Sequence, residues 1–337
     1  MSPTAPLFAL PALTRRRAIC LFASALSAPS MTNIASAAEP TSKWQGTALG
    51  GDVSIMLEGF TEAKANELFT KATAELLRLE QIFSLYVEHS SINQLNDAGQ
   101  LASSPPELVA ALNLSADLHR QSQGAFDPTV QPLWELFARL STPGMPNTDS
   151  ALLDATLARI GFQHVHMSGD HIQLHNEAKI TLNGIAQGFI TDRIASLFQA
   201  AGAKHTLVNL GEFQANGPKH DGSAWRIALR DPTSSWRMAG LVEIEKGALA
   251  TSANAHDFRR TQHHLFDPRT GRSPSHYIGV SVVAPNAALA DGLSTALFAL
   301  PPVEAFQLVS QYKETAARFT LVDGQVTKTD LWHEIEN

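Results

Sequence analysis

Cysteine is almost absent from this chain of 337 residues, because Cys20 is the only one. We expect Cys20 to be removed with an N-terminal signal, which would leave the mature protein without any thiol. A chain without thiols forms no disulfide, no thiolate-ligated metal site and no cysteine nucleophile. These three kinds of chemistry are therefore excluded for the mature protein.

An excess of positive charge is also missing, because 25 Lys and Arg residues face 32 Asp and Glu residues, for a formal net charge of −7. This balance does not favour binding to nucleic acid or to an anionic membrane surface. Beyond the N-terminal segment, no apolar run is long enough to span a bilayer. Hydrophobic residues make up 44% of the chain, so we expect one large domain or two closely packed ones.

The N-terminus has the features of an export signal. Three arginines at residues 15–17 precede an apolar stretch over residues 18–28, and a small-x-small site ends at Ala37. The consecutive arginines favour the twin-arginine route, which exports folded proteins, and a plain secretory signal is the alternative. We predict that residues 1–37 form a cleavable export signal and that residues 38–337 form the functional domain.

Export in this manner predicts a periplasmic protein. Cys20 lies too close to the arginines for a lipid-modified cysteine, and Ile19 before it is not a small residue. We therefore expect no lipoprotein anchor.

Strand and helix patterns alternate irregularly along the mature chain. Residues 61–83 form an amphipathic helical pattern, and a second helix is expected to begin at residues 105–106 after a Ser104 cap. Residues 83–97 read as irregular, and residues 143–149 as a surface loop. Further helices are expected over residues 132–140, 151–160, 287–300 and 303–312, and further strands or hairpins over residues 44–57, 164–174, 206–210, 225–229, 241–245, 278–283 and 318–326. This mixed order predicts an α+β fold.

Four histidines cluster around the hairpin expected at residues 164–174: His164, His166, His171 and His175. Strand alternation would place His164 and His166 on one face, so a two-histidine metal clip is conceivable. No carboxylate completes a recognisable ligand set, and we favour exposed strand histidines.

The stretch over residues 181–193, TLNGIAQGFITDR, is a candidate for the centre of the fold. We expect a strand over residues 179–182, a turn at Asn183-Gly184, and a helix from Ile185 in which Gly188 permits close approach. A strand followed by a glycine turn and a helix start can aim backbone N–H groups at an anion. An ordinary strand-to-helix turn is the alternative.

Asp291 and Thr295 are four residues apart in a predicted helix and therefore share one face. A carboxylate and a hydroxyl one turn apart are hard oxygen donors, which suit Mg²⁺. The alternative is that Asp291 is only an N-terminal helix charge. His264 stands beside a tight turn at residues 267–271, where it is either a general base or a surface residue.

Several motifs, taken together and in order, resemble the FAD:protein FMN transferase family, the ApbE-like flavin transferases. The motifs are GAFDPTV (124–130), LNGIAQG (182–188), LVNLGE (207–212), WRIALRDP (225–232), ALATSA (248–253), HLFDPRTGR (264–272) and ADGLSTALF (290–298). The resemblance covers residues 44–312. It implies an α+β fold of two lobes with a flavin-nucleotide site in the cleft between them.

The resemblance also implies an activity: Mg²⁺-dependent transfer of FMN from FAD to a Thr or Ser hydroxyl of an acceptor protein, with release of AMP. It implies metal ligation by Asp291, Thr295 and the carbonyl of Gly184, with His264 as the base. Residues implied to contact FAD are Gln45, Tyr86, Ala125, Phe126, Asp127, Thr181, Gln187 and Phe266.

This chain departs from the common family pattern at two of these positions. Thr181 stands where many members have Asp, and Gln187 stands where many have Lys. One charge of each sign is lost, which suggests a paired change that alters FAD affinity while the metal pair is kept. The LNGIAQG version resembles the branch linked to nitrous oxide respiration, whose acceptor would be an exported, membrane-bound redox protein. An FAD pyrophosphatase and a non-catalytic FAD-binding protein are the alternatives.

Overall fold

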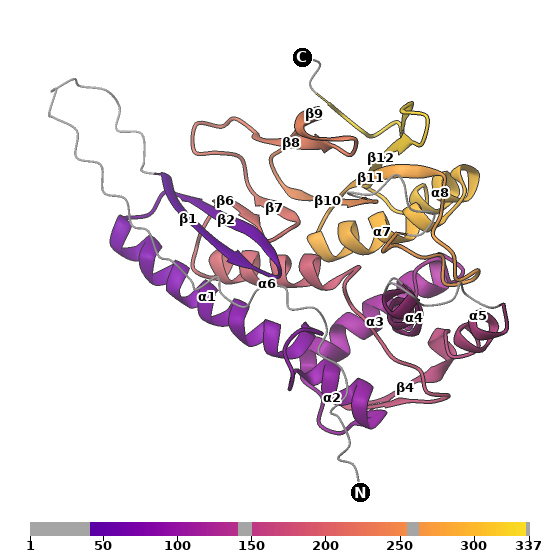
Figure 1. Cartoon of the computed structure of the whole chain (residues 1–337). Coiled ribbons are helices and arrows are strands. Elements are labelled where there is room, and N and C mark those ends of the chain that lie inside the picture. The colour runs from indigo at the N-terminus through magenta and orange to yellow at the C-terminus, as the bar shows by residue number, and fades with distance from the viewer. Residues whose placement is uncertain (1–40, 141–149, 255–262, 335–337) are drawn as a thin grey trace, which may run out of the picture. The chain divides into compact units, whose positions relative to one another are not determined.

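An eight-stranded antiparallel sheet forms the centre of the fold, in the order β1-β2-β6-β7-β10-β11-β12-β13 (Figure 1). The computed structural model describes residues 41–140, 150–254 and 263–334, and Ser36–Asn337 form one compact unit. The strands of this sheet are β1 (Thr41–Ala48), β2 (Gly51–Glu58), β6 (His205–Asn209), β7 (Phe213–Asn216), β10 (Gly247–Ala253), β11 (Tyr277–Ala284), β12 (Ala316–Leu321) and β13 (Val326–Lys328).

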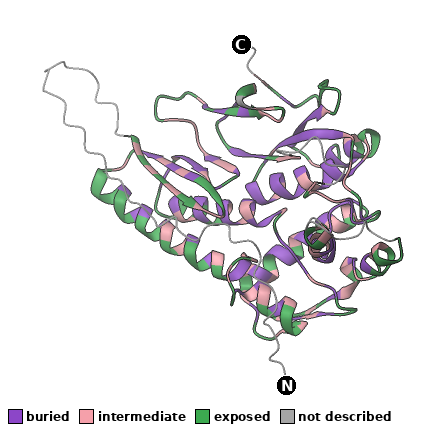
Figure 2. Ribbon diagram, viewed as in Figure 1, coloured by how far each residue is buried: buried purple, intermediate pink, exposed green. Residues whose placement is uncertain are grey.

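The two faces of this sheet carry different layers. Strand alternation sends Val208 and Ala250 into a large core that includes α1 (Glu62–Phe83), α6 (Ala186–Ala200) and α7 (Ala287–Ala299). Leu207 and Leu249, their neighbours in sequence, join a smaller core under the hairpin of β8 (Trp225–Asp231) and β9 (Ser234–Ile244). Figure 2 shows α7 buried along most of its surface, whereas α1 keeps an exposed face.

A helical part is inserted between β2 and β6. Its elements are α2 (Ser91–Ala98), α3 (Pro106–Gln121), α4 (Gln131–Leu140), α5 (Ser150–Leu157), the 3-10 turn η1 (Phe162–His164) and a small sheet ordered β3 (Gln100–Leu101), β5 (His171–Leu174), β4 (Val165–Ser168). The short helix α8 (Pro302–Val309) follows α7. The α+β class predicted from the sequence is confirmed by this mixture of helices and antiparallel sheets.

Local chemistry explains several elements that the sequence predicted. Thr61 caps α1, since its side chain accepts a hydrogen bond from the Lys64 N–H. The first strand region is a hairpin that turns at Leu49-Gly50, and Gly50 has a left-handed φ of 81°. The hairpin expected within residues 164–174 is the pair β4 and β5, and Gly169 occupies the turn between them with a left-handed φ of 63°.

Three local predictions are wrong. Residues 83–97 are not irregular throughout, because Ser90 caps the helix α2. Residues 179–182 form no strand, and only Lys179 makes an isolated bridge, to Val130. The helix α3 is preceded by Pro105 rather than by a Ser104 cap, because the Ser104 hydroxyl donates to the Leu101 carbonyl instead.

The two-histidine clip considered for residues 164–174 lacks the strand geometry it needs, and His166 and His175 are exposed, in line with the favoured interpretation. His164 ends the 3-10 turn η1 rather than lying on a strand, so the alternation that would pair it with His166 does not apply. In the described part of the chain, no group of three or more His, Cys, Asp or Glu side chains could hold a metal ion.

The described helices include none that is both long enough and apolar enough to cross a membrane. The predicted export signal and the loop predicted at residues 143–149 lie outside the described residues.

Candidate active site

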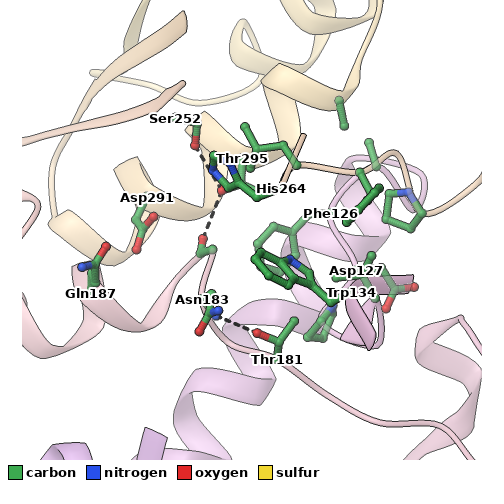
Figure 3. Close-up of a pocket in the computed structure, with 18 of the residues that line it drawn as sticks. Phe126, Asp127, Trp134, Thr181, Asn183, Gln187, Ser252, His264, Asp291 and Thr295 are labelled. Carbon is green, nitrogen blue, oxygen red and sulfur yellow. Dashed lines mark hydrogen bonds between the residues drawn. The ribbon is translucent and has the colours of Figure 1, made fainter. Parts of the chain in front are cut away.

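A cavity of about 340 Å³ opens between the helical part and the helix-covered face of the large sheet. Its walls come from the turn before α4, the segment before α6, the strand β10, the segment of residues 264–268 and the helix α7 (Figure 3). Among the residues that line it are Ala125, Phe126, Asp127, Thr181, Gly184, Gln187, His264, Phe266, Asp291 and Thr295.

Most residues named by the family resemblance are therefore neighbours in space, although they span residues 125–295. Two are not part of this cavity. Gln45 is exposed on the edge strand β1, and the Tyr86 side chain is 87% exposed between α1 and α2. Whether any of these residues contacts FAD stays a prediction.

The three predicted metal ligands converge from two elements. Asp291 and Thr295 lie on one face of α7, and the Thr295 hydroxyl is 3.5 Å from the carbonyl oxygen of Gly184, which precedes α6. The Ser252 hydroxyl, on β10, lies 3.3 Å from the Thr295 hydroxyl (Figure 3). A carboxylate, a hydroxyl and a backbone carbonyl facing one space are the hard oxygen donors that Mg²⁺ prefers.

The charges around the cavity favour a cation. Three carboxylate residues, Asp127, Glu212 and Asp291, belong to the described lining, and none of the described lining residues is Lys or Arg. A diphosphate brought into such a cavity would meet like charge, unless a cation accompanied it. The donor set and the charge balance thus both fit a divalent ion such as Mg²⁺.

Burial strongly affects two of these carboxyl groups. Asp291 is only 5% exposed, and burial raises its pKa to about 7, while the hydrogen bond from the Gly188 N–H acts in the opposite direction. Burial, and then the charge of Asp291, hold the pKa of Glu212 well above its ordinary value. A cation between the two would offset the free energy lost by removing these carboxylates from water.

Asp127 is held by its own turn. Its Oδ1 atom accepts hydrogen bonds from the Thr129 N–H and hydroxyl, and its Oδ2 atom lies 3.2 Å from His119 Nδ1. The Thr129 hydroxyl also accepts a hydrogen bond from the Gly161 N–H. The carboxylate therefore ties together α3, the turn and the start of η1. Its hydrogen bond to His119 is the main cause that raises the pKa of that histidine.

The two positions that depart from the family pattern have local partners. The Thr181 hydroxyl accepts a hydrogen bond from the Asn183 N–H, which stabilises the turn that presents Gly184. The Gln187 side chain packs against Gly211, where an added Cβ would lie 2.8 Å from Gln187 Nε2. Gly211 also has a φ of 108°. Both the lack of space for a Cβ and this backbone conformation therefore favour glycine at residue 211.

The start of α6 differs from the anion site that its sequence pattern suggested. The Gly188 N–H, in the first turn of α6, donates to Asp291 Oδ2 at 2.9 Å. A protein carboxylate thus occupies the favourable position at this helix N-terminus. The expectation of N–H groups left free for a ligand is wrong for Gly188.

His264 lies at the mouth of the cavity. Desolvation by the surrounding protein, and to a smaller extent the neighbouring His263 ring, lower its pKa, although the residue keeps solvent access. A lowered pKa keeps the imidazole neutral at pH 7, so that a ring nitrogen can accept a proton. His263 is held separately, by the Pro274 carbonyl and the Leu265 N–H.

Sequence reasoning missed four residues that shape the site. Ser252 and Glu212 line the cavity and belong to two of the family motifs, but neither residue had been assigned a role. Trp134 of α4 lines the cavity as well. Asn96 of α2 exchanges two hydrogen bonds with the backbone of Ile180, and this pairing replaces the predicted strand contact.

Known proteins resemble this chain in sequence and in fold. The family model described as "ApbE family" matches residues 49–319. The chain belongs to the ApbE family. A curated relative from Klebsiella pneumoniae (strain 342), named "FAD:protein FMN transferase", is 28% identical, and the match covers 89% of this chain and 90% of that protein.

Solved structures of other ApbE proteins have the same fold. The apo form of the Pseudomonas stutzeri flavinyl transferase ApbE matches this ApbE-family chain with a TM-score of 0.76 at 27% identity, covering 87% of this chain and 96% of that one. The flavin transferase ApbE from Vibrio cholerae matches with a TM-score of 0.75 at 25% identity, covering 86% of this chain and 97% of that one.

Proposed function

We propose that this protein is an FAD:protein FMN transferase that moves FMN from FAD to a Ser or Thr hydroxyl of an acceptor protein and releases AMP. Family membership and the names of the relatives support this reaction. We further propose that the reaction requires Mg²⁺, held by Asp291, Thr295 and the Gly184 carbonyl. The observation that carries the Mg²⁺ proposal is the meeting of these three oxygen donors in an acidic cavity whose described lining has no Lys or Arg.

In this proposal four residues of the cavity take part in the transfer: Gly184, Asp291, Thr295 and His264. The Gly184 carbonyl, Asp291 and Thr295 would hold the ion, which would supply positive charge against the diphosphate and the departing AMP. A neutral ring nitrogen of His264 takes the proton of the acceptor hydroxyl. The hydroxyl oxygen bonds to the phosphorus of the FMN half, the bond from that phosphorus to the bridging oxygen breaks, and AMP leaves with the electron pair.

The sequence of the N-terminal segment supports a proposal for where the reaction takes place. We propose that residues 1–37 direct export, that the enzyme acts in the periplasm without a lipid anchor, and that the acceptor is an exported domain of a membrane-bound redox protein. The arginines at residues 15–17 support the twin-arginine route. The LNGIAQG motif at residues 182–188 supports an acceptor linked to nitrous oxide respiration.

Two other functions use the same cavity. An FAD pyrophosphatase would give FMN and AMP with water as the acceptor, and it differs from the transferase only in what reaches the phosphorus. A non-catalytic FAD-binding protein is favoured by Thr181 and Gln187, because the paired loss of charge there alters the contacts that many family members have.

One incubation separates the three functions. The mature chain is mixed with FAD, Mg²⁺ and a candidate acceptor domain, and the acceptor mass, free FMN and free AMP are measured. A mass gain equal to FMN, together with AMP, supports the transferase. Free FMN and AMP with an unmodified acceptor would instead identify a pyrophosphatase, and tight FAD binding without AMP a binding protein. EDTA in place of Mg²⁺ is the control for the metal proposal.

A further inference from the structure

The helices α6 and α7, which both contribute to the candidate active site, each supply a carboxylate that accepts hydrogen bonds from N–H groups at the N-terminus of the other helix. Asp291 of α7 accepts the N–H of Gly188, in the first turn of α6, at 2.9 Å. In return, Asp192 of α6 accepts the N–H groups of Ala287 and Ala288, the first two residues of α7, at 2.8 and 2.9 Å. Each carboxylate thus satisfies N–H groups that a helix start leaves without an internal partner.

The spacing on each helix makes this exchange a closed ring. Gly188 and Asp192 are four residues apart on α6, and Ala287 and Asp291 are four apart on α7, so each pair lies on one helix face. The backbones touch between the two pairs, because a Cβ at Gly188 would lie 2.2 Å from the Ala287 carbonyl oxygen. The ring therefore fixes how far α7 can slide along α6.

The position of α7 along α6 decides the shape of the proposed metal site. Gly184 precedes α6, whereas Asp291 and Thr295 belong to α7, so the ligand atoms come from both sides of this contact. The contact is already close, since a Cβ at Gly184 would lie 3.0 Å from Thr295 Oγ1. A small shift of α7 would change the distance from the Gly184 carbonyl to both α7 ligands.

We propose that Asp192 is a positioning residue for the metal site: its two hydrogen bonds to α7 hold Asp291 and Thr295 at the distance from Gly184 that a divalent ion requires. This inference rests on the proposed Mg²⁺ site. Among the described residues, Gly188 alone donates a hydrogen bond to the Asp291 carboxylate, and it does so to Oδ2, so Oδ1 is the oxygen left for the ion. Groups that hydrogen-bond a metal ligand directly change ion affinity by about 10- to 100-fold, and Asp192 acts one step further out, through the backbone of the first two residues of α7.

Asn286 provides a matched control. Its side chain accepts the N–H of Leu289 and so caps α7 from within the same helix. Asn286→Ala weakens the start of α7 but leaves both hydrogen bonds from α7 to Asp192. Asp192→Ala removes those two bonds and leaves the Asn286 cap. A purely structural role for Asp192 would make the two variants behave alike.

The test measures Mn²⁺ binding to the mature chain by electron paramagnetic resonance of the free ion, so that it does not depend on turnover. We expect the Mn²⁺ dissociation constant to rise about 10-fold in Asp192→Asn, which keeps one acceptor oxygen, and up to about 100-fold in Asp192→Ala. Asn286→Ala should stay within twofold of the wild type. AMP release by Asp192→Asn should recover at high Mg²⁺ concentration.

Two results would overturn the positioning role: Mn²⁺ affinity in Asp192→Ala within twofold of the wild type, or an equal loss of affinity in Asn286→Ala. A wild-type chain that transfers FMN while Asp192→Ala binds Mn²⁺ normally would refute this inference alone. A wild-type chain that binds no Mn²⁺ would refute the proposed metal site as well.

Discussion

The turn around Asp127 and the junction of α6 with α7 both bury a carboxylate beside the same cavity, but they treat it differently. The Asp127 oxygens are engaged by Thr129 and His119. Asp291 is equally buried, yet among the described residues only the Gly188 N–H donates to it. A carboxylate whose partners are all internal stabilises its own loop, whereas one that is desolvated and under-paired is available to a cation.

Asp291→Ala should cause the largest change in activity. We expect loss of Mg²⁺-dependent AMP release by more than about 100-fold, because a direct ligand matters more than its outer partners. The protein should still fold, because Asp291 is a buried carboxylate with few hydrogen-bond partners, and removing such a group costs little folding stability. AMP release and the thermal unfolding midpoint are to be measured together, and activity retained at the wild-type level would contradict the assignment of Asp291 as a ligand.

His264→Ala should slow transfer by about 10²- to 10⁴-fold while FAD affinity changes little, because a general base acts in the transition state. Single-turnover transfer and equilibrium FAD binding separate the two effects. His166→Ala, an exposed histidine on β4, is the control. Equal losses of transfer rate and FAD affinity would assign His264 to binding instead.

Asp127→Ala should mainly lower stability, whereas Asp291→Ala should mainly lower activity. Its removal leaves the Thr129 N–H and hydroxyl without their acceptor and leaves His119 with the Phe126 carbonyl alone, so we expect the free energy of unfolding to fall by about 3 kcal/mol. Chemical denaturation measures this loss. If Asp127→Ala were as stable as the wild type and only FAD binding were lost, Asp127 would be a ligand contact rather than a tie within the turn.

The smallest effect concerns the pH dependence of the Asp127 turn. The pKa of His119 is raised above 6.5, mainly by its hydrogen bond to Asp127, so protonated His119 stabilises the folded state. That stabilisation is fully present below pH 6.5 and is lost as pH rises through the raised pKa. The difference in unfolding free energy between the wild type and His119→Gln should therefore shrink from pH 6 to pH 9, by about 1 kcal/mol or less. A constant difference would mean that His119 only packs against Phe162, which its ring contacts.

Much of the site could be predicted from the spacing of residues within one helix. Asp291 and Thr295 were placed on one face by periodicity alone, and α7 has them there. The requirement for glycine at residue 188 was also visible in the sequence, and the backbone contact with Ala287 explains it. The family motifs added the remaining proposed ligand, Gly184, which no local pattern distinguishes from an ordinary turn residue.

Long-range pairings escaped sequence reasoning. The bond from Gly188 to Asp291 joins residues 103 apart, and the bond from Asn96 to Ile180 joins residues 84 apart. Neither leaves a periodic signal, because both partners look like ordinary polar or small residues in their own segments. Asn96 also shows why residues 179–182 form no strand: a side-chain amide, rather than a neighbouring strand, satisfies the Ile180 backbone.

The pairing of β2 with β6 has a consequence for how the protein is made. These adjacent strands are separated in sequence by the whole helical part, from Glu58 to His205, and the cavity lining extends further to Ala299. Contacts between such distant segments form late, because a long loop must close first. No partly synthesised chain that ends before α7 can contain the site, so a ribosome must finish nearly the entire polypeptide before any catalytic competence exists.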